Sequence, residues 1–228
     1  MKTKIIGEIG INHFGEKKII RNYLENFKAK GLDGISIQIL KKNKVEKKLE
    51  KFCLKKKDIE FFLKEAKKKY KSVGVAIHTW DDFEFLSKQK IDFIKVLGSS
   101  FGNFKYIQKV NKLKVKRIFL STGSKSIQEI TKFMRIIKSK KIILLYTFFE
   151  TKNFLKSIKN ISLIKNKLEM PVAYGNHYSK INQILKVKKY NPSEIFLYLK
   201  MNKKINYPDN EHAIPLNKIS VMIKNLKK

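Results

Sequence analysis

Eight short apolar runs, separated by longer amphipathic stretches, constrain the fold of this 228-residue chain more than any other feature. The runs are apolar throughout, as expected of parallel strands that are buried on both faces. Eight strand–helix units in this length predict an α/β fold, a (β/α)8 TIM barrel that forms a single domain over residues 1–228. A doubly wound open sheet is the alternative. The predicted strands are residues 5–9, 34–38, 74–78, 93–97, 117–121, 141–146, 171–175 and 194–199.

Four of the intervening stretches carry clear helical patterns, at residues 16–31, 55–70, 124–140 and 215–228. The first places apolar residues on one face and ends at Gly31, a residue suited to a helix C-terminus. Asp58 is expected to be the N-cap or a first-turn acid of the second. The lysine-rich stretch 41–58 is expected to be a solvated loop or a helical excursion between a strand and its helix.

The formal net charge of +33 raises the question of a polyanionic partner. A chain this basic binds polyanions non-specifically at low salt. Of its 52 basic residues, however, 49 are lysine, whereas specific readers of nucleic acid favour the arginine fork. Lysine, isoleucine and asparagine are abundant together, as AT-rich codons produce. We therefore expect no specific nucleic-acid partner.

Neither a membrane span nor a secretory signal is expected from the sequence. No run of about 18 apolar residues occurs, and Glu8 interrupts the apolar residues near the start. The single cysteine, Cys53, cannot form an internal disulfide, which fits a reducing compartment. These features predict a cytoplasmic protein without a membrane partner.

The carboxyl ends of the predicted strands carry the candidate functional residues, because reactive groups of such barrels lie at that face. The first strand ends in Glu8, and Asn12 and His13 follow it. Other strand ends place further polar residues at the same mouth. These are Ser36, Gln38, His78, Thr79, Lys95, Ser99, Ser100, Ser121, Thr122, Tyr146, Thr147, Asn176, His177, Tyr198, Lys200, Asp209, Glu211 and His212.

Lys95 is unusual because it lies inside an apolar run. Such a lysine either extends its stem outward over a helix or meets an anion. The next strand ends in Ser121-Thr122-Gly123, whose small donors and backbone amides suit a phosphate or carboxylate. That turn alone also describes a helix N-cap. Together with Lys95 it predicts an anion site.

Two histidines remain open between functional and structural roles. His177 follows a Gly-Asn turn at a strand end, where a metal ligand would project, but a hydrogen-bonded structural histidine is equally consistent. His13 is a candidate substrate or second-layer group, or a brace for the first loop.

The segment GEIGINHFG at residues 7–15 resembles the first strand of the N-acetylneuraminate (sialic acid) synthase family. Further segments that resemble this family follow in the same order, at residues 31–38, 78–100, 118–130, 171–179 and 207–219. The resemblance implies a (β/α)8 barrel that joins phosphoenolpyruvate to the aldehyde of N-acetylmannosamine or a related amino sugar and releases phosphate. It further implies a divalent metal ion, Mn or Mg, that polarises the aldehyde, and a homodimer.

The resemblance also implies roles for individual residues. It makes Glu8 and Asp209 catalytic, with Glu211 as the alternative to Asp209, and His177 a metal ligand. Lys95 and Ser121 would hold the phosphate and carboxylate of phosphoenolpyruvate. The remaining substrate-binding candidates are Asn12, His13, Gln38, Thr79, Ser99 and Thr122.

Several positions depart from the family pattern. Ser36 stands where the family has a lysine, Gly98 where it has a serine, and the second metal histidine falls near Leu197 or Tyr198. The family's C-terminal antifreeze-like domain has no counterpart in residues 1–228. A paralogue without this chemistry, which keeps an anion-binding barrel as a binding or scaffold protein, is therefore the alternative function.

Overall fold

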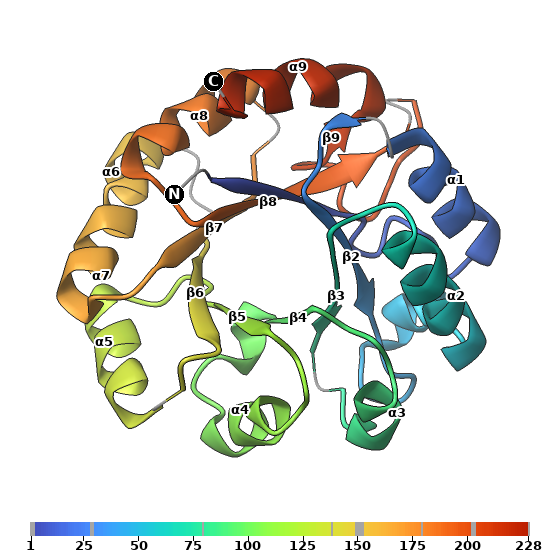
Figure 1. Cartoon of the computed structure of the whole chain (residues 1–228), viewed down its shortest axis with the longest axis horizontal. Coiled ribbons are helices and arrows are strands. Elements are labelled where there is room, and N and C mark those ends of the chain that lie inside the picture. Colours follow the sequence, from blue (N-terminus) through green and yellow to red (C-terminus); the bar gives the residue numbers. More distant parts are fainter. Residues whose placement is uncertain are drawn as a thin grey trace.

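The parallel strands close into a barrel, because β1 pairs with β2 on one side and with β8 on the other. The computed structural model describes residues 3–27, 30–78, 80–137, 139–148, 153–178, 180–201 and 204–227. Figure 1 shows the closed barrel with helices around it. The (β/α)8 prediction is confirmed, and the open-sheet alternative is wrong.

Each predicted strand forms within a residue or two of its expected bounds. An additional short strand, β9, pairs with the end of β8 and was not predicted, because two residues carry no periodic pattern. The strands are β1 Lys4–Glu8, β2 Gly34–Ile39, β3 Ser72–Ile77, β4 Phe93–Val96, β5 Arg117–Ser121, β6 Ile142–Tyr146, β7 Val172–Asn176, β8 Glu194–Lys200 and β9 Ile214–Pro215.

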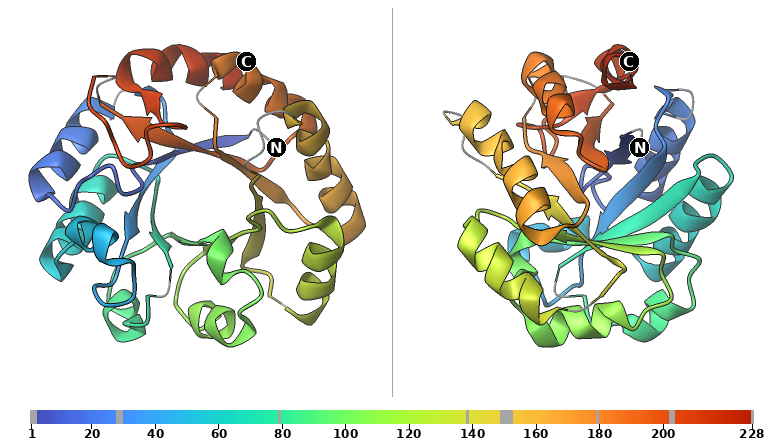
Figure 2. Two further views of the ribbon diagram at one scale, coloured as in Figure 1. Left: turned by 180° about the vertical axis from the view of Figure 1, so that it is seen from behind. Right: turned by 60° about the vertical axis from the view of Figure 1, so that its left-hand side comes forward.

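Helices surround the barrel and cover the outer face of its strands, as the two views of Figure 2 show. The α-helices are α1 Lys17–Phe27, α2 Lys56–Lys67, α3 Phe83–Ser87, α4 Phe104–Asn111, α5 Ile127–Ile136, α6 Phe154–Ile158, α7 Asn160–Leu168, α8 Ile181–Lys186 and α9 Leu216–Lys227. Short 3-10 helices are η2 Lys47–Phe52, η3 Gly98–Ser100 and η4 Val187–Tyr190. No helix among the described residues is long and apolar enough to cross a membrane.

Local signals set several helix boundaries. Ser126 caps α5 in a capping box with Glu129, and Asp58 lies in the first turn of α2. Gly31, the expected C-terminal residue of the first helix, has a φ of 81° in the left-handed region. The lysine-rich stretch 41–58 forms η2 and the start of α2, so the expected helical excursion is confirmed. Phe52 anchors it by packing with Ile11 and Leu40.

The barrel interior is layered, and this layering positions the site. At the amino-terminal end of the strands, Arg117 forms an ion pair with Glu194. The middle layer is apolar and consists of Ile6, Phe93, Phe119, Leu145, Ala173 and Phe196. Its three phenylalanines pack edge to face at centroid distances of 4.9 to 5.8 Å. This layer fills the middle of the barrel. The polar residues above it are therefore accessible only from the carboxyl ends of the strands.

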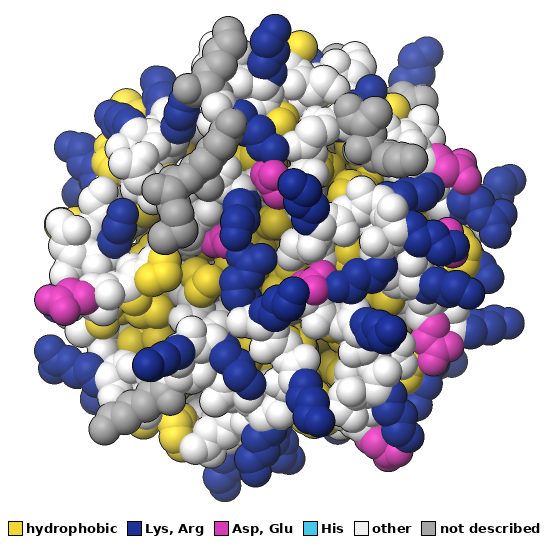
Figure 3. All heavy atoms as spheres, in the orientation of Figure 1, with side chains coloured by type: hydrophobic (Ala, Val, Ile, Leu, Met, Phe, Trp, Pro, Cys, Tyr) yellow, Lys and Arg dark blue, Asp and Glu magenta, His cyan; other side chains and the backbone are white. Residues whose placement is uncertain are grey.

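The lysines cover the surface broadly. Figure 3 shows Lys and Arg side chains over the whole visible face, with a few acidic residues between them. The visible face carries no single basic stripe of the kind that follows a nucleic-acid backbone.

Candidate active site

A buried ion pair between Glu8 and Lys95 lies above the apolar layer. Lys95 Nζ is 2.5 Å from Glu8 Oε2, and the two side chains are 2% and 0% exposed. Lys95 Nζ also lies 3.4 Å from the hydroxyl of Tyr198 and 5.1 Å from the centre of its ring. Lys95 therefore points into the barrel, and the alternative of an outward stem is wrong.

The same layer contains polar atoms without a partner. Glu8 pairs in register with Ser36 on β2, and both side chains are fully buried. Within the part of the chain that the structure describes, Glu8 Oε1 and Ser36 Oγ have no hydrogen-bond partner. Unsatisfied buried polar atoms are rare in proteins and mark places where a ligand or an ordered water binds.

A cavity of about 430 Å³ opens beside this ion pair, and we call it the anion pocket. It brings together most of the residues predicted for an anion site. The residues that line it include Lys95, Ser99, Ser121, Thr122, Lys125, His177 and Tyr198. Two lysines and the hydroxyls of Ser99, Ser121, Thr122 and Tyr198 around one cavity are suited to an anion with more than one charged group.

Two glycines allow the two lining loops of the anion pocket to touch. A Cβ on Gly98 would lie 2.8 Å from the backbone nitrogen and Cα of Gly123. Gly123 itself has a φ of 57°, in the left-handed region. A serine at position 98 would therefore require the two loops to move apart.

Hydroxyl groups on the neighbouring strand ends fix the shape of this pocket. Ser121 Oγ lies 3.1 Å from Thr147 Oγ1, and the Thr147 amide donates to Thr122 Oγ1 at 3.2 Å. On the opposite side, Ser99 Oγ is 2.7 Å from His78 Nδ1. Burial lowers the pKa of His78 below its ordinary value, so at neutral pH the imidazole is a neutral partner for the serine.

Asn12 and His13 brace the first loop through hydrogen bonds within the protein, and their role in substrate binding stays a prediction. The Gly15 amide donates to His13 Nδ1, and His13 Nε2 then donates to the carbonyl of Gln38, both at 3.0 Å. Burial lowers the pKa of His13 to about 4, which keeps the ring neutral. Asn12 bridges the carbonyl of Leu199 and the amide of Asp209, each at 2.9 Å.

Asp209, rather than Glu211, is the acid that faces the ion pair. Its Oδ2 accepts a hydrogen bond from the Ile11 amide at 3.1 Å. Burial, with a smaller contribution from the Glu8 carboxylate, raises the pKa of Asp209 to about 6. Glu211 is exposed. The side chain predicted to handle a proton therefore has a pKa close to neutrality.

His212 belongs to the same cluster, although no sequence pattern distinguishes it from the other mouth residues. Its ring centroid is 4.5 Å from that of Tyr198 and 4.7 Å from that of His177. Among the described residues, its buried Nε2 has no hydrogen-bond partner. His212 lies on the irregular segment between β8 and β9, where no periodic pattern indicates the direction of a side chain.

The residues present do not form a ready-made metal site. In the described ranges, no group of three or more His, Cys, Asp or Glu side chains is placed to hold a metal ion. His177 and His212 are adjacent, and burial lowers the pKa of both, so both are neutral imidazoles. The nearby Lys95 charge lowers both values further and disfavours a second cation. Since protein metal centres generally use three or more ligands, this donor set does not fit a resident divalent metal.

Gln38 and Thr79 complete the predicted set. Gln38 is half-buried near the end of β2 and pairs in register with Ala76, which in turn pairs with Lys95. Among the described residues that line the anion pocket, Gln38 is absent. Thr79 lies outside the described residues.

Comparisons with known proteins identify a family and two relatives of this chain. The sequence model of the NeuB family matches residues 23–228. The N,N'-diacetyllegionaminic acid synthase of Campylobacter jejuni is 23% identical over 254 residues, which cover 99% of this chain and 76% of that enzyme. The uncharacterized protein MJ1065 of Methanocaldococcus jannaschii is 26% identical over 243 residues, covering 99% of this chain and 70% of that protein.

Solved structures support the fold. The N-acetylneuraminic acid synthetase of Leptospira borgpetersenii, in complex with citrate, superposes with a TM-score of 0.89 at 18% identity. The match covers 99% of this chain and 83% of that one. A truncated 3-deoxy-D-arabino-heptulosonate 7-phosphate synthase of Thermotoga maritima superposes with a TM-score of 0.75 at 14% identity, covering 99% and 85%.

Proposed function

Because the chain belongs to the NeuB family, we propose that it condenses phosphoenolpyruvate with the aldehyde of an N-acylated amino sugar and releases phosphate. The product would be a nonulosonic acid. The observation that carries this proposal is the anion pocket, which is lined by Lys95, Lys125 and several hydroxyls and lies above the apolar layer.

Phosphoenolpyruvate carries two anionic groups, and the pocket supplies donors for both. Lys95 lies at its base and Lys125 at its exposed rim. The hydroxyls of Ser99, Ser121 and Thr122 lie between them. Charge-assisted hydrogen bonds of this kind are roughly twice as strong as neutral ones, so the two lysines supply most of the affinity.

The proposed reaction forms one carbon–carbon bond and breaks one carbon–oxygen bond. Carbon 3 of phosphoenolpyruvate attacks the aldehyde carbon, and the aldehyde oxygen takes a proton. Water adds to carbon 2 and loses a proton, and the bond from carbon 2 to the phosphate oxygen breaks. Phosphoenolpyruvate, aldehyde and water thus give the product and inorganic phosphate.

The residues of the site have matching roles in this proposal. Positive charge develops at carbon 2, and the Glu8 carboxylate beside the pocket stabilises it. Asp209, with a pKa of about 6, can exchange a proton near neutral pH, and we assign it the proton transfer with water or the aldehyde oxygen. No step in this scheme passes through a metal ion. The metal role of His177 stays a prediction.

A binding protein without turnover is the second candidate. The observation in its favour is that Glu8 already neutralises Lys95, while Ser36 supplies no charge in the position of the family's lysine. Such a barrel would bind the anion and release it unchanged.

The test is calorimetric titration with phosphoenolpyruvate at about 0.15 M salt, which screens loose electrostatic binding. We expect one saturable site that Lys95→Ala abolishes. Lys109→Ala, which removes an exposed lysine on α4, is the matched control and should bind normally. Phosphate release on addition of N-acetylmannosamine would then support the synthase over the binding protein. Binding no tighter than that of inorganic phosphate would rule out the proposed function.

A further inference from the structure

His78 contacts one of the hydroxyl groups that line the anion pocket. It directly follows β3, and its Nδ1 lies 2.7 Å from Ser99 Oγ and 3.4 Å from Ser100 Oγ. Ser99 lines the anion pocket, whereas His78 and Ser100 are not among its described lining residues. The shorter contact makes Ser99 the residue through which the imidazole can affect a bound anion.

The backbone around Ser99 is held in place, so its hydroxyl proton is the part that can turn. The Leu97 amide donates to the carbonyl of Ile77 at 3.1 Å, which ties the start of η3 to the end of β3. The Ser100 amide donates to the Leu97 carbonyl at 2.9 Å within the same turn. Rotation about the Cβ–Oγ bond of Ser99 leaves its oxygen beside His78 and moves only its proton.

The short contact between Ser99 Oγ and His78 Nδ1 requires a hydrogen between the two atoms, because two lone pairs would repel at 2.7 Å. A serine hydroxyl has one proton, and a neutral imidazole carries one proton on either Nδ1 or Nε2. Two arrangements of the protons are therefore possible. Either the Ser99 hydroxyl donates to Nδ1, or the Nδ1–H group donates to Ser99 Oγ.

The two arrangements present different groups to an anion. If Ser99 donates to the ring, its only proton is used and its oxygen turns lone pairs toward the pocket. If Nδ1 donates to Ser99, the serine proton can point at a phosphate or carboxylate oxygen. Because an anion accepts hydrogen bonds, it binds more tightly to the second arrangement.

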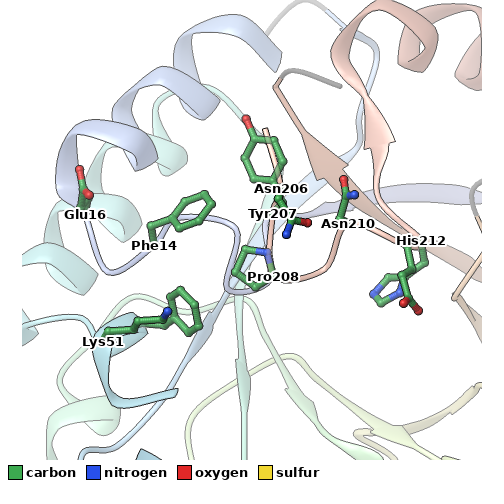
Figure 4. A pocket seen from close by; sticks show the side chains of 10 residues that line it. Phe14, Glu16, Lys51, Asn206, Tyr207, Pro208, Asn210 and His212 are labelled. Atoms are coloured by element: carbon green, nitrogen blue, oxygen red, sulfur yellow. The ribbon is translucent and has the colours of Figure 1, made fainter. Parts of the chain in front are cut away.

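A larger cavity also opens at the mouth of the barrel, but His78 and Ser99 are not among its described lining residues. Its volume is about 730 Å³, and Figure 4 shows Phe14 at one end and His212 at the other. The β1–α1 loop, η2 and the 206–212 segment line it. A substitution at His78 or Ser99 therefore tests the anion pocket without changing the described lining of this cavity.

From this geometry we propose that His78 is a positioning residue for the anion pocket. In the complex its Nδ1 carries a proton and donates to Ser99 Oγ, so that Ser99 turns its own proton toward the phosphate or carboxylate of phosphoenolpyruvate. This inference rests on the proposed function and deepens it, because it identifies what orients one of the donors. His78 acts on the anion only through Ser99.

The first test uses the wild-type protein and therefore does not depend on the folding of a variant. Long-range ¹H–¹⁵N spectra of the imidazole rings distinguish a nitrogen that carries a proton from one that does not, and the chain has only four histidines. The protein is titrated near neutral pH, at about 0.15 M salt, with phosphoenolpyruvate and separately with inorganic phosphate. We expect Nδ1 of His78 to be protonated in the complex. An unprotonated Nδ1 at saturation overturns the proposal.

Variants measure how much this hydrogen bond contributes to anion binding. His78→Leu removes the ring donor and should weaken phosphoenolpyruvate binding by about fivefold, as expected for one hydrogen bond. His78→Asn can donate from its amide to Ser99 and should stay within about twofold of the wild type. It also identifies the NMR signals of His78 by their loss. Equal losses in His78→Leu and His78→Asn would show that the ring has only a structural role.

Ser100→Ala is the matched comparison, because it removes the farther of the two hydroxyls at the same nitrogen. Its dissociation constant for phosphoenolpyruvate should stay within about twofold of the wild type, since a contact of 3.4 Å contributes little. A loss as large as that of Ser99→Ala would overturn the assignment of Ser99 as the oriented donor.

A double-mutant cycle shows whether His78 acts through Ser99. Ser99→Ala should weaken binding about as much as His78→Leu, and the double variant should lose no more than Ser99→Ala alone. Additive losses would mean that His78 affects the anion by another route and would overturn the positioning role.

The two anions separate this inference from the proposed function. If phosphoenolpyruvate binds no more tightly than inorganic phosphate, the condensation is overturned, while a protonated Nδ1 in the phosphate complex still supports the arrangement of His78 and Ser99. If phosphoenolpyruvate binds tightly while Nδ1 is unprotonated, the proposed function stands and the positioning role is overturned. An absence of saturable binding of either anion overturns both.

Discussion

Lys95 Nζ lies 2.5 Å from Glu8 Oε2, although the two residues are 87 positions apart in the chain. One comes from β4 and the other from β1, and both point into the barrel above its apolar layer. Each is the counter-charge of the other, and both side chains are almost completely buried. The pair therefore affects stability and ligand binding together.

Removing one member of this pair should cost more than removing both. Lys95→Met leaves the Glu8 carboxylate buried without a counter-charge, and we expect a loss of about 3–5 kcal/mol in the free energy of unfolding. Lys95→Met/Glu8→Gln should recover most of that loss, because no charge remains buried. Urea unfolding of the two variants and the wild type measures both values. Equal stability of the single and double variants would contradict a coupled pair.

Asp209 should make the free energy of unfolding depend on pH in a way that an exposed aspartate would not. Its pKa rises from 3.8 to about 6 on folding, mainly through burial, so the folded state holds the proton more tightly. The resulting stabilisation is complete below pH 3.8 and is lost as the pH rises through 6. Asp209→Asn removes this loss and should be more stable than the wild type at pH 7, by up to roughly 3 kcal/mol.

Urea unfolding between pH 4 and pH 8 checks this prediction. Glu211→Gln, which changes an exposed carboxyl in the same segment, is the control variant. If the proposed function holds, Asp209→Asn should also lose most phosphate release while it still binds phosphoenolpyruvate. A parallel pH dependence in Asp209→Asn and the wild type would show that this carboxyl titrates normally.

Gly10 leaves room for the side chain of Asp209 and has a left-handed backbone conformation. Its φ is 62°, and a Cβ there would lie 2.2 Å from Asp209 Oδ2. Gly102 is a matched control, because its φ of 90° carries similar strain but a Cβ there would meet nothing within 4 Å. We expect both Ala variants to lose about 1–2 kcal/mol from backbone strain, and Gly10→Ala to lose more through the clash. Thermal unfolding gives the difference, and equal losses would show that Asp209 moves aside freely.

Metal binding should be weak without substrates. The described residues offer two adjacent imidazoles and a nearby ammonium group, which is a poor site for a divalent cation. We expect calorimetry to show no saturable Mn²⁺ binding with a dissociation constant below about 1 mM. Tight binding that His177→Ala abolishes would instead establish His177 as the ligand that the family resemblance implies.

The local pattern of apolar and polar residues was sufficient to predict most helices and strands of the fold. Apolar runs with helical stretches between them predicted all eight barrel strands, because burial on both faces leaves a direct mark on the sequence. β5 formed at its predicted bounds, and the N-terminus of α5 formed where its serines and Glu129 supply a capping box. The sequence does not determine the direction of the Lys95 side chain, since strand periodicity alone does not say which face is the barrel interior.

The sequence by itself determined the order of strands and helices, and hence the barrel and the set of polar residues at its mouth. Only the tertiary structure decided which of these residues meet. It paired Lys95 with Glu8, turned His13 into a loop brace, and brought His212 against Tyr198. The physical reason is that strand and helix patterns arise from local periodicity, whereas these contacts depend on barrel closure and on the paths of irregular loops. Neither barrel closure nor the path of a loop produces a periodic pattern in the sequence.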